Sequence, residues 1–322
     1  VELQIVDKAA SSGRPVNVNS LASIFAKGFL AGLVVCFALA TVYLLSVRTV
    51  RKESDMKRIT SARCISCIPE VVPKKRSNNK KLKLLITNKR IDWGFKQSIL
   101  MIQSRLQQIM RRTGDKVLLI TSTIPAEGKT MTSVNMALAF AQEGLKVALL
   151  DGDLRKPSVS ELMKLPEGPG LTEYFRGEST PEEIQVVKDG VTFFRAGQKK
   201  GKVSGLIDEE KMNSLLEKLR KEYDVILMDA APSYVFSDAM ILSSYADKVL
   251  YVVRVDKADA KEIRVGMNSF EEKEKLIGYV INRDTGGYIS QSGYGYGRYG
   301  KYQKYRKYAE LDEETMNTED TL

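Results

Sequence analysis

The residues best suited to chemistry begin in the stretch STIPAEGKTMTS, residues 122–133. Gly128, Lys129 and Thr130 match the end of the Walker A pattern G-x-x-x-x-G-K-[ST], while Thr123 stands at its first glycine position. In such a loop, backbone N–H groups cradle phosphate oxygens, the lysine neutralises them and the hydroxyl binds Mg²⁺. The stretch therefore predicts a phosphate-binding loop.

Acidic residues follow two further apolar runs. VALLDGDLRKP carries Asp151, Asp153 and Arg155, and VILMDAAP carries Asp229. A single aspartate after a strand is commonly a cap or a turn residue. In a doubly wound sheet, however, ligands bind beyond the carboxyl ends of the strands, where these side chains and Lys129 would converge. Together the three motifs predict a Mg-nucleotide site.

The elements that must position these residues are buried strands alternating with helices. Continuous apolar runs favour strands at 117–121, 147–151, 225–229, 248–253 and 279–282. Helical periodicity marks residues 133–144 and 209–223. This alternation predicts an α/β fold of the P-loop NTPase type, with a mostly parallel, doubly wound sheet.

An apolar run precedes this domain. Residues 28–47 carry no charge, and twenty helical residues span about 30 Å, the thickness of the hydrocarbon core. We expect a transmembrane helix over residues 21–47. Basic residues crowd its C-terminal end, so the positive-inside rule places residues 1–20 outside and the following domain in the cytoplasm. Gly28 and Gly32 form a GxxxG, which either associates helices or occurs by chance.

Residues 48–92 contain fourteen basic and four acidic residues, a net charge of +10 that equals the net charge of the whole chain. With two prolines and little apolar periodicity, this segment is predicted to be a juxtamembrane linker. It would act as a tether and attract anionic lipid, at about 1 kcal/mol per basic residue.

The residue types that the sequence lacks exclude several kinds of catalytic and metal site. The chain has no histidine, which removes the commonest general base and every Ser-His-Asp arrangement. Cys64 and Cys67 form a CxxC without further Cys or His ligands nearby. A redox pair or half of a site between subunits stays open, although two unpaired thiols are favoured.

The three motifs together resemble those of the bacterial tyrosine kinases (BY-kinases) of capsule and exopolysaccharide assembly. Asp151-Gly152-Asp153-Leu154-Arg155 matches the family's D-x-D-x-R motif, and Asp229 to Pro232 matches its Walker B motif less one proline. SDAMILSSYADKVLYVVR (237–254) is similar to the stretch that follows. The beginning, VELQIVDKA, is similar to the end of the family's extracytoplasmic chain-length domain.

The resemblance implies a protein-tyrosine kinase that uses ATP and Mg²⁺. The implied catalytic residues are Lys129, Asp151, Asp153, Arg155 and Asp229, with Asp151 as the base. Those implied to bind nucleotide are Glu127, Gly128, Lys129, Thr130, Met131, Asn282 and Arg283. Those implied to bind the metal are Thr130, Asp153 and Asp229.

The resemblance also implies a domain order and partners. The chain would comprise the end of the chain-length domain (1–20), the membrane helix (21–47), the linker (48–92), the kinase domain (93–286) and a tyrosine-rich tail (287–322). The implied partners are further copies of the chain, polysaccharide polymerase and export machinery, a phosphotyrosine phosphatase and membrane lipid. The location would be the bacterial inner or plasma membrane.

The tail reads GYGYGRYGKYQKYRKY at residues 293–308, followed by six acidic residues and no basic ones. A period of three leaves no lasting helical stripe, and the glycines disfavour helix, so we predict exposed phosphoacceptors. These are Tyr294, Tyr296, Tyr299, Tyr302, Tyr305 and Tyr308. Interleaved Tyr and Lys/Arg could also stack on bases, but beside a membrane anchor we expect no nucleic-acid partner.

Two alternatives stay open. Thr123 and Ala126 depart from the usual glycines, and Trp93, Lys96 and Ile99 stand where the family's E-x-x-R-x-x-R oligomerisation motif would fall. The chain could therefore be a membrane-tethered ATPase, or a polysaccharide co-polymerase scaffold with a degenerate kinase domain.

Overall fold

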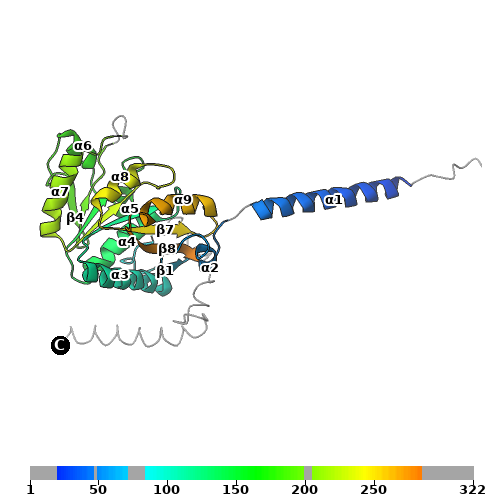
Figure 1. Cartoon of the computed structure of the whole chain (residues 1–322), viewed down its shortest axis with the longest axis horizontal. Helices are drawn as coiled ribbons and strands as arrows, with labels where there is room; N and C mark the ends of the chain where they lie inside the picture. The colour runs from blue at the N-terminus through cyan, green and yellow to red at the C-terminus, as the bar shows by residue number, and fades with distance from the viewer. Residues whose placement is uncertain (1–19, 47–48, 72–83, 199–204, 285–322) are drawn as a thin grey trace, which may run out of the picture. The chain divides into compact units, whose positions relative to one another are not determined.

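The computed structural model describes residues 20–46, 49–71, 84–198 and 205–284. The chain divides into two compact units, residues 1–48 and residues 49–322. The unit at the N-terminus contributes a single described helix, and the second contains the sheet (Figure 1).

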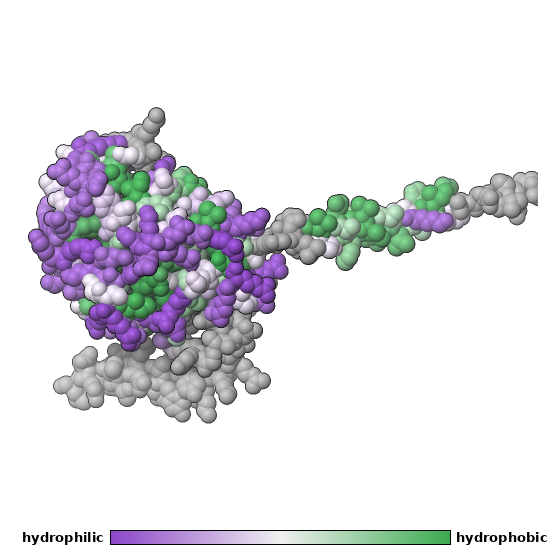
Figure 2. Space-filling model, viewed as in Figure 1, coloured by the Kyte–Doolittle hydropathy of each residue, from purple (hydrophilic) through white to green (hydrophobic). Residues whose placement is uncertain are grey.

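The first unit is built on α1 (Leu21–Ser46), a helix of 26 residues. Its apolar side chains are exposed, with Phe25 and Phe37 retaining about three quarters of their surface. Figure 2 shows an almost continuous hydrophobic surface along this helix. Leu21–Val42 is long and apolar enough to cross a membrane, judged by length and composition.

The second unit is organised around an eight-stranded sheet of order β1-β8-β7-β2-β6-β3-β5-β4. All neighbouring strands run parallel except the edge pair β4 and β5, which is antiparallel. The strands are β1 (Cys64–Pro69), β2 (Val117–Ser122), β3 (Val147–Asp151), β4 (Gln185–Lys188), β5 (Val191–Phe194), β6 (Val225–Asp229), β7 (Lys248–Arg254) and β8 (Leu276–Asp284).

Helices cover both faces of the sheet. The helices of this unit are α2 (Glu53–Met56), α3 (Trp93–Thr113), α4 (Lys129–Gln142), α5 (Val159–Met163), α6 (Leu171–Arg176), α7 (Glu209–Glu222), α8 (Asp238–Tyr245) and α9 (Ala260–Glu271). Apolar side chains of α3, α4 and α5 pack in one cluster, and those of α6 to α9 pack in the other. The predicted doubly wound α/β fold is thus confirmed.

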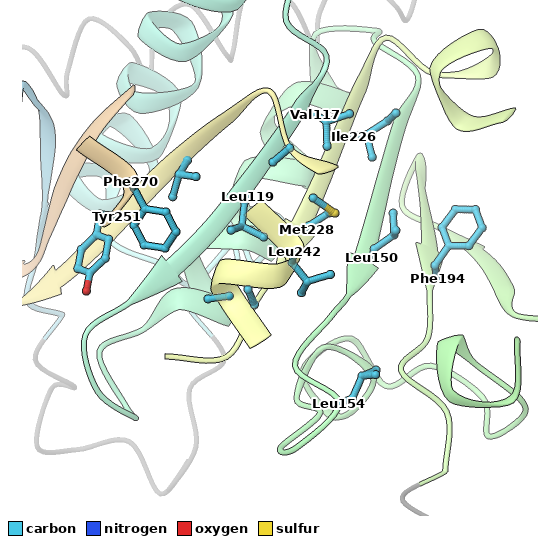
Figure 3. Packing of buried hydrophobic residues seen from close by; sticks show 14 of the residues in the cluster. Val117, Leu119, Leu150, Leu154, Phe194, Ile226, Met228, Leu242, Tyr251 and Phe270 are labelled. Carbon is cyan, nitrogen blue, oxygen red and sulfur yellow. The ribbon is translucent and has the colours of Figure 1, made fainter. Parts of the chain in front are cut away.

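Alternate residues of each central strand contribute side chains to the two clusters, because successive side chains of a strand point to opposite faces of the sheet. In β2, Val117 and Leu119 face the cluster with α6 to α9, whereas Leu118 and Ile120 face the cluster with α3 to α5. Figure 3 shows the cluster that contains α6 to α9. Ile226 and Met228 of β6 lie there beside Leu119 of β2 and Leu242 of α8. These positions are 2% exposed or less. The strand ends that carry the motifs are therefore anchored in a dry core.

The prediction of a linker over residues 48–92 is wrong for a large part of that segment. Residues 49–71 belong to the second unit, and β1 pairs with β8. Val50, Met56 and Ile68 are at most 1% exposed. The many basic residues around β1 favoured the prediction of a linker, although they flank a short apolar strand. Because this strand is buried against β8, the folded domain begins at Thr49. Residues 72–83, which include the whole KKRSNNKKLK run, lie outside the described residues.

The central elements agree with the predictions more closely. β3 and β6 have the predicted bounds, while β8 is longer than predicted at both ends. The helix predicted at 133–144 begins at Lys129 instead, directly after the loop.

Candidate nucleotide-binding and active site

The phosphate-binding loop connects β2, which ends at Ser122, to α4, which begins at Lys129. Gly128 has φ 97°, in the left-handed region that favours glycine. A Cβ at this position would lie 2.1 Å from Nδ2 of Asn282. Only glycine fits between the loop and the end of β8, so the sequence match at this position reflects a real steric constraint.

Glu127 braces the loop from within. Its side chain is fully buried and accepts hydrogen bonds from the backbone N–H groups of Ile124 (2.8 Å) and Arg254 (3.2 Å). Burial raises the pKa of Glu127 to about 7, although these N–H donors act in the opposite direction. The Glu127 carboxylate therefore faces its own loop, so the predicted nucleotide contact by Glu127, which stays a prediction, would be made by its backbone.

The Lys129 ammonium is held by two aspartates. Its Nζ lies 2.6 Å from Oδ2 of Asp153 and 3.8 Å from Oδ2 of Asp229. Burial acts against the charge of Lys129, but the attraction of Asp229 and Asp153 outweighs it and raises the lysine pKa. The Walker lysine is thus charged and positioned at the ends of β3 and β6.

Asp229 also receives two hydroxyl groups from α4. Thr130 Oγ1 donates to Oδ2 at 2.6 Å, and Ser133 Oγ donates to Oδ1 at 3.1 Å. Ser133 was not predicted as a site residue. It lies one helical turn beyond Lys129, on the same helix face, and this spacing is the signal that could have found it.

Asp151 is buried at the end of β3, beside this cluster of charged side chains. It is fully buried, and Oδ2 accepts the N–H of Val159 at 3.2 Å, whereas Oδ1 has no hydrogen-bond partner. Burial, followed by repulsion from Asp229, raises the pKa of Asp151 well above its usual range. Burial likewise raises the pKa of Asp229. Within the cluster, Asp151 therefore offers an acceptor oxygen with an increased affinity for a proton.

Arg155 does not reach the lysine cluster. It pairs with Asp238 at the start of α8, through Nε and through Nη2 (3.1 Å to Oδ1). Its guanidinium also stacks on the ring of Phe236, 4.5 Å from the centroid. Arg155 thus ties the loop after β3 to α8, and Asp238 is a partner that the sequence prediction missed.

Beside the loop lies a cleft of about 390 Å³. The predicted residues Gly128, Met131, Asn282 and Arg283 all line it, together with Phe95. Asn282 Nδ2 donates to the carbonyl oxygen of Glu127 at 2.7 Å, and its Oδ1 accepts the N–H of Arg283 at 2.9 Å. The end of β8 thus holds the loop and forms a wall of the cleft.

The donor atoms are suitable for Mg²⁺, which prefers oxygen and commonly uses one or two carboxylates plus phosphate oxygens. The Thr130 hydroxyl and the carboxylates of Asp153 and Asp229 meet around Lys129. In the described part of the chain, no group of three or more Asp, Glu, Cys or His could hold a metal by itself. A cation here would therefore depend on further oxygen ligands, such as those of a nucleotide.

The structure thus brings Lys129, Thr130, Asp151, Asp153 and Asp229 together and leaves Arg155 in a neighbouring contact. The six predicted phosphoacceptor tyrosines, from Tyr294 to Tyr308, lie outside the described residues.

Fold and loop define the class: a P-loop NTPase. Consistently, residues 114–258 match the ParA family model, described as NUBPL iron-transfer P-loop NTPase. That match covers less than half of the chain, so the family is better judged from relatives that align over a longer part of it.

A tyrosine-protein kinase CpsD of Streptococcus pneumoniae is 34% identical over 184 residues, which cover 53% of this chain and 78% of that protein. A putative tyrosine-protein kinase in the cps region of Klebsiella pneumoniae is 26% identical over 293 residues, or 87% of this chain. Only 40% of the Klebsiella protein is covered, so the chain spans well under half of that relative.

Solved structures agree. The kinase domain of the Escherichia coli tyrosine kinase ETK matches with a TM-score of 0.62 and 25% identity, over 74% of this chain and 94% of that one. The chimerical protein CapA2B2 matches with a TM-score of 0.63 and 25% identity, over 72% and 99%. The chain belongs to the bacterial tyrosine-protein kinase family of capsule and exopolysaccharide regions.

Proposed function

We propose that the chain is a membrane-anchored tyrosine kinase that transfers the γ-phosphoryl group of Mg-ATP to tyrosines of its own tail segment on a neighbouring copy. The observation that carries this proposal is the Lys129 ammonium between Asp153 and Asp229, at the ends of adjacent parallel strands beside an open cleft. The names of the relatives support the choice of tyrosine as acceptor.

Phosphoryl transfer depends mainly on positioning and on neutralising charge. Lys129 would move from its aspartates to the β- and γ-phosphates, and loop N–H groups at the start of α4 would hold the remaining oxygens. Thr130, Asp153 and Asp229 would hold Mg²⁺, which, when bound, neutralises negative charge on the phosphate oxygens. The cleft formed by Met131, Asn282 and Arg283 would take the base.

Asp151 is the proposed general base. A tyrosine phenol with an ordinary pKa of about 10 needs a proton acceptor within hydrogen-bond reach. The unpartnered Oδ1 of Asp151 and its raised pKa suit that role. Because the side chain is fully buried, binding of substrate must open the segment around it.

The proposed acceptors are the six tail tyrosines in a basic segment. Each phosphate adds about −1.5 to −2 charges, so multiple phosphorylation would convert the segment from basic to acidic and weaken its attraction to an acidic site. The further partners proposed are other copies of the chain, a phosphotyrosine phosphatase, anionic lipid and the polysaccharide polymerisation and export machinery. α1 would anchor the chain in a bacterial membrane, with the second unit in the cytoplasm.

The test is tyrosine phosphorylation of the full chain in detergent after incubation with Mg-ATP, read by mass spectrometry of residues 287–322. Lys129→Ala and Asp151→Asn should each remove most of the signal. Lys218→Ala changes an exposed lysine that is paired with Glu182 and serves as the matched control. A phosphotyrosine signal that is undiminished in both site variants would refute the proposal.

A second candidate is an ATPase or scaffold of polysaccharide assembly without tyrosine transfer. One observation favours it: Ala126 in the loop has φ 67°, a conformation that suits glycine better than alanine. ATP turnover without phosphotyrosine would identify the ATPase, and failure to bind Mg-ATP would identify the scaffold.

A further inference from the structure

The CxxC of the sequence lies in β1, the edge strand within the segment that was predicted to be a linker. In a regular strand, residues three apart point to opposite faces. Cys64 and Cys67 do not follow this rule. Cys67 belongs to the apolar cluster on the α7 to α9 side, and Cys64 packs against the same cluster.

A β-bulge is the cause. Cys64 is in register with Tyr279 of β8, and Ser66 is in register with Val280, so β1 advances two residues while β8 advances one. The extra residue, Ile65, faces the α3 side of the sheet. Ser66 faces that side too, since its hydroxyl donates to Sδ of Met101 in α3 at 3.7 Å.

The opposing strand accommodates this bulge at Gly278. A Cβ there would lie 2.5 Å from the carbonyl oxygen of Arg63 and 2.8 Å from Cδ1 of Ile65. The bulge is thus matched by a glycine in β8, next to Tyr279, the residue in register with Cys64, and is part of the packing of the domain.

The bulge shortens the separation of the two cysteines. Cys64 to Cys67 spans only Tyr279 to Ile281 in β8, two positions, or about 6.6 Å along a strand. Disulfides usually join Cα atoms roughly 4.4–6.8 Å apart. Cys64 Sγ points along the strand, 3.8 Å from the carbonyl oxygen of Ser66. The Cys64 thiol is the largest cause, and burial the next, of a raised pKa of the Cys67 thiol.

We propose that Cys64 and Cys67 form a reversible intrastrand disulfide by exchange with a low-molecular-weight disulfide. The Cys64 thiolate attacks one sulfur of that disulfide, forms a mixed disulfide and releases one thiolate. The Cys67 thiolate then attacks Cys64 Sγ, closes the protein disulfide and releases the second thiolate. Two protein thiols are oxidised, the small disulfide is reduced to two thiols, and the two cysteine protons pass to the released thiolates.

The order of attack follows from exposure. Cys64 is half-buried, whereas Cys67 is 4% exposed, and exchange requires access to the attacking thiol. Cys64 is therefore the entry point, and Cys67 is the resolving thiol. Persistent disulfides are rare in reducing compartments, where transient ones generally serve catalysis or redox sensing.

The experiment uses the reduced full chain in detergent, in a Cys36→Ser background so that only this pair can react. Oxidised glutathione is added, free thiols are then alkylated, and the peptide containing residues 64–67 is analysed by mass spectrometry. We expect a peptide that has lost two hydrogens and carries neither alkyl group nor glutathione. Dithiothreitol should restore two alkylatable thiols.

Single-cysteine variants test the assigned roles. Cys67→Ser should leave Cys64 as a stable glutathione adduct, and Cys64→Ser should leave Cys67 unreacted over the same time. A glutathione adduct at Cys64 beside a free Cys67 in the two-cysteine protein would overturn the proposal. So would two free thiols, a disulfide between two chains, or equal reaction of both single-cysteine variants.

Discussion

The two halves of the candidate nucleotide site are built differently. The phosphate half, Lys129, Thr130, Asp151, Asp153 and Asp229, lies on adjacent central strands and on the helix that follows β2. Its carboxylates are at most 3% exposed. The other half, where we propose that the nucleobase binds and which we call the base half, is the open cleft formed by the end of β1, α3, the loop and the end of β8.

The difference separates the two tasks of a nucleotide site. Lys129, Asp153 and Asp229 in the phosphate half are desolvated and paired with one another, so each charge affects both stability and chemistry. Side chains of the base half contribute a few hydrogen bonds and packing at a partly open surface, where net contributions are modest. We therefore expect substitutions in the two halves to differ by orders of magnitude in their effect on phosphorylation.

The largest effect is expected for Lys129→Met. It removes the cation that would stabilise the phosphates, so phosphotyrosine formation should fall at least about a hundredfold. It also leaves Asp153 and Asp229 without their buried partner, which should destabilise the fold by about 3 kcal/mol. Kinetics and urea unfolding of the full chain in detergent would measure both effects.

Arg220→Ala is the control for this stability effect, because the Arg220–Asp247 pair is partly exposed, at 37% and 21% of the side-chain surface. A partly exposed pair contributes about 1 kcal/mol or less. Equal destabilisation by the two substitutions would abolish the proposed contrast between buried and exposed charge.

A pH-dependent effect of intermediate size is expected at Glu127, which lies between the halves. Its pKa is raised from 4.5 to about 7 in the folded chain. The folded state thus binds the proton more tightly than the unfolded state. The resulting contribution to the free energy of unfolding is fully present below pH 4.5 and is lost as the pH rises through 7. Glu127→Gln should gain about 2 kcal/mol relative to the wild type between pH 5 and pH 8.

Urea unfolding of both proteins at these two pH values measures that difference. The chain has no histidine to titrate in the same range. A difference independent of pH would mean that the N–H groups of Ile124 and Arg254 keep Glu127 ionised throughout.

A smaller effect is expected for Asn282→Ala in the base half. It removes the 2.7 Å hydrogen bond to the carbonyl oxygen of Glu127, worth about 1 kcal/mol. The Kd for ATP should rise about fivefold, as measured by equilibrium binding, while the rate at saturating ATP changes little. A loss of rate as large as that of Lys129→Met would place Asn282 functionally in the phosphate half.

The smallest effect is expected for Arg283→Ala. The side chain is half-exposed and its ion pair with Glu70 is 3.6 Å long, so the Kd for ATP should change less than threefold, in line with about 0.5 kcal/mol. A tenfold weakening of ATP binding would instead indicate a direct contact with the nucleotide.

The same contrast explains what could be predicted from the sequence. β3 and β6 are buried on both faces, so their apolar runs fix their bounds, and the aspartates at their ends follow from the parallel sheet. The phosphate half was therefore predictable residue by residue, apart from Ser133 and the inward turn of the Glu127 side chain.

Peripheral elements were harder to predict. The strand CISCIP is short, contains serine and proline, and adjoins basic residues, so its segment was interpreted as a linker. Its burial depends on pairing with β8, more than two hundred residues away, which no local pattern reveals. The β4–β5 hairpin also went unpredicted, although Asp189-Gly190 between two apolar runs is a recognised hairpin signal.

The ion pairs of Lys129 have a consequence for the order of binding. If Lys129 left Asp153 and Asp229 for a phosphate, as proposed, two buried carboxylates would lose their counter-charge as further negative charge arrived. Nucleotide alone is thus opposed electrostatically, and cation alone is opposed by the resident ammonium. We therefore expect nucleotide and cation each to bind strongly only when the other is bound, by the reciprocity of linked equilibria.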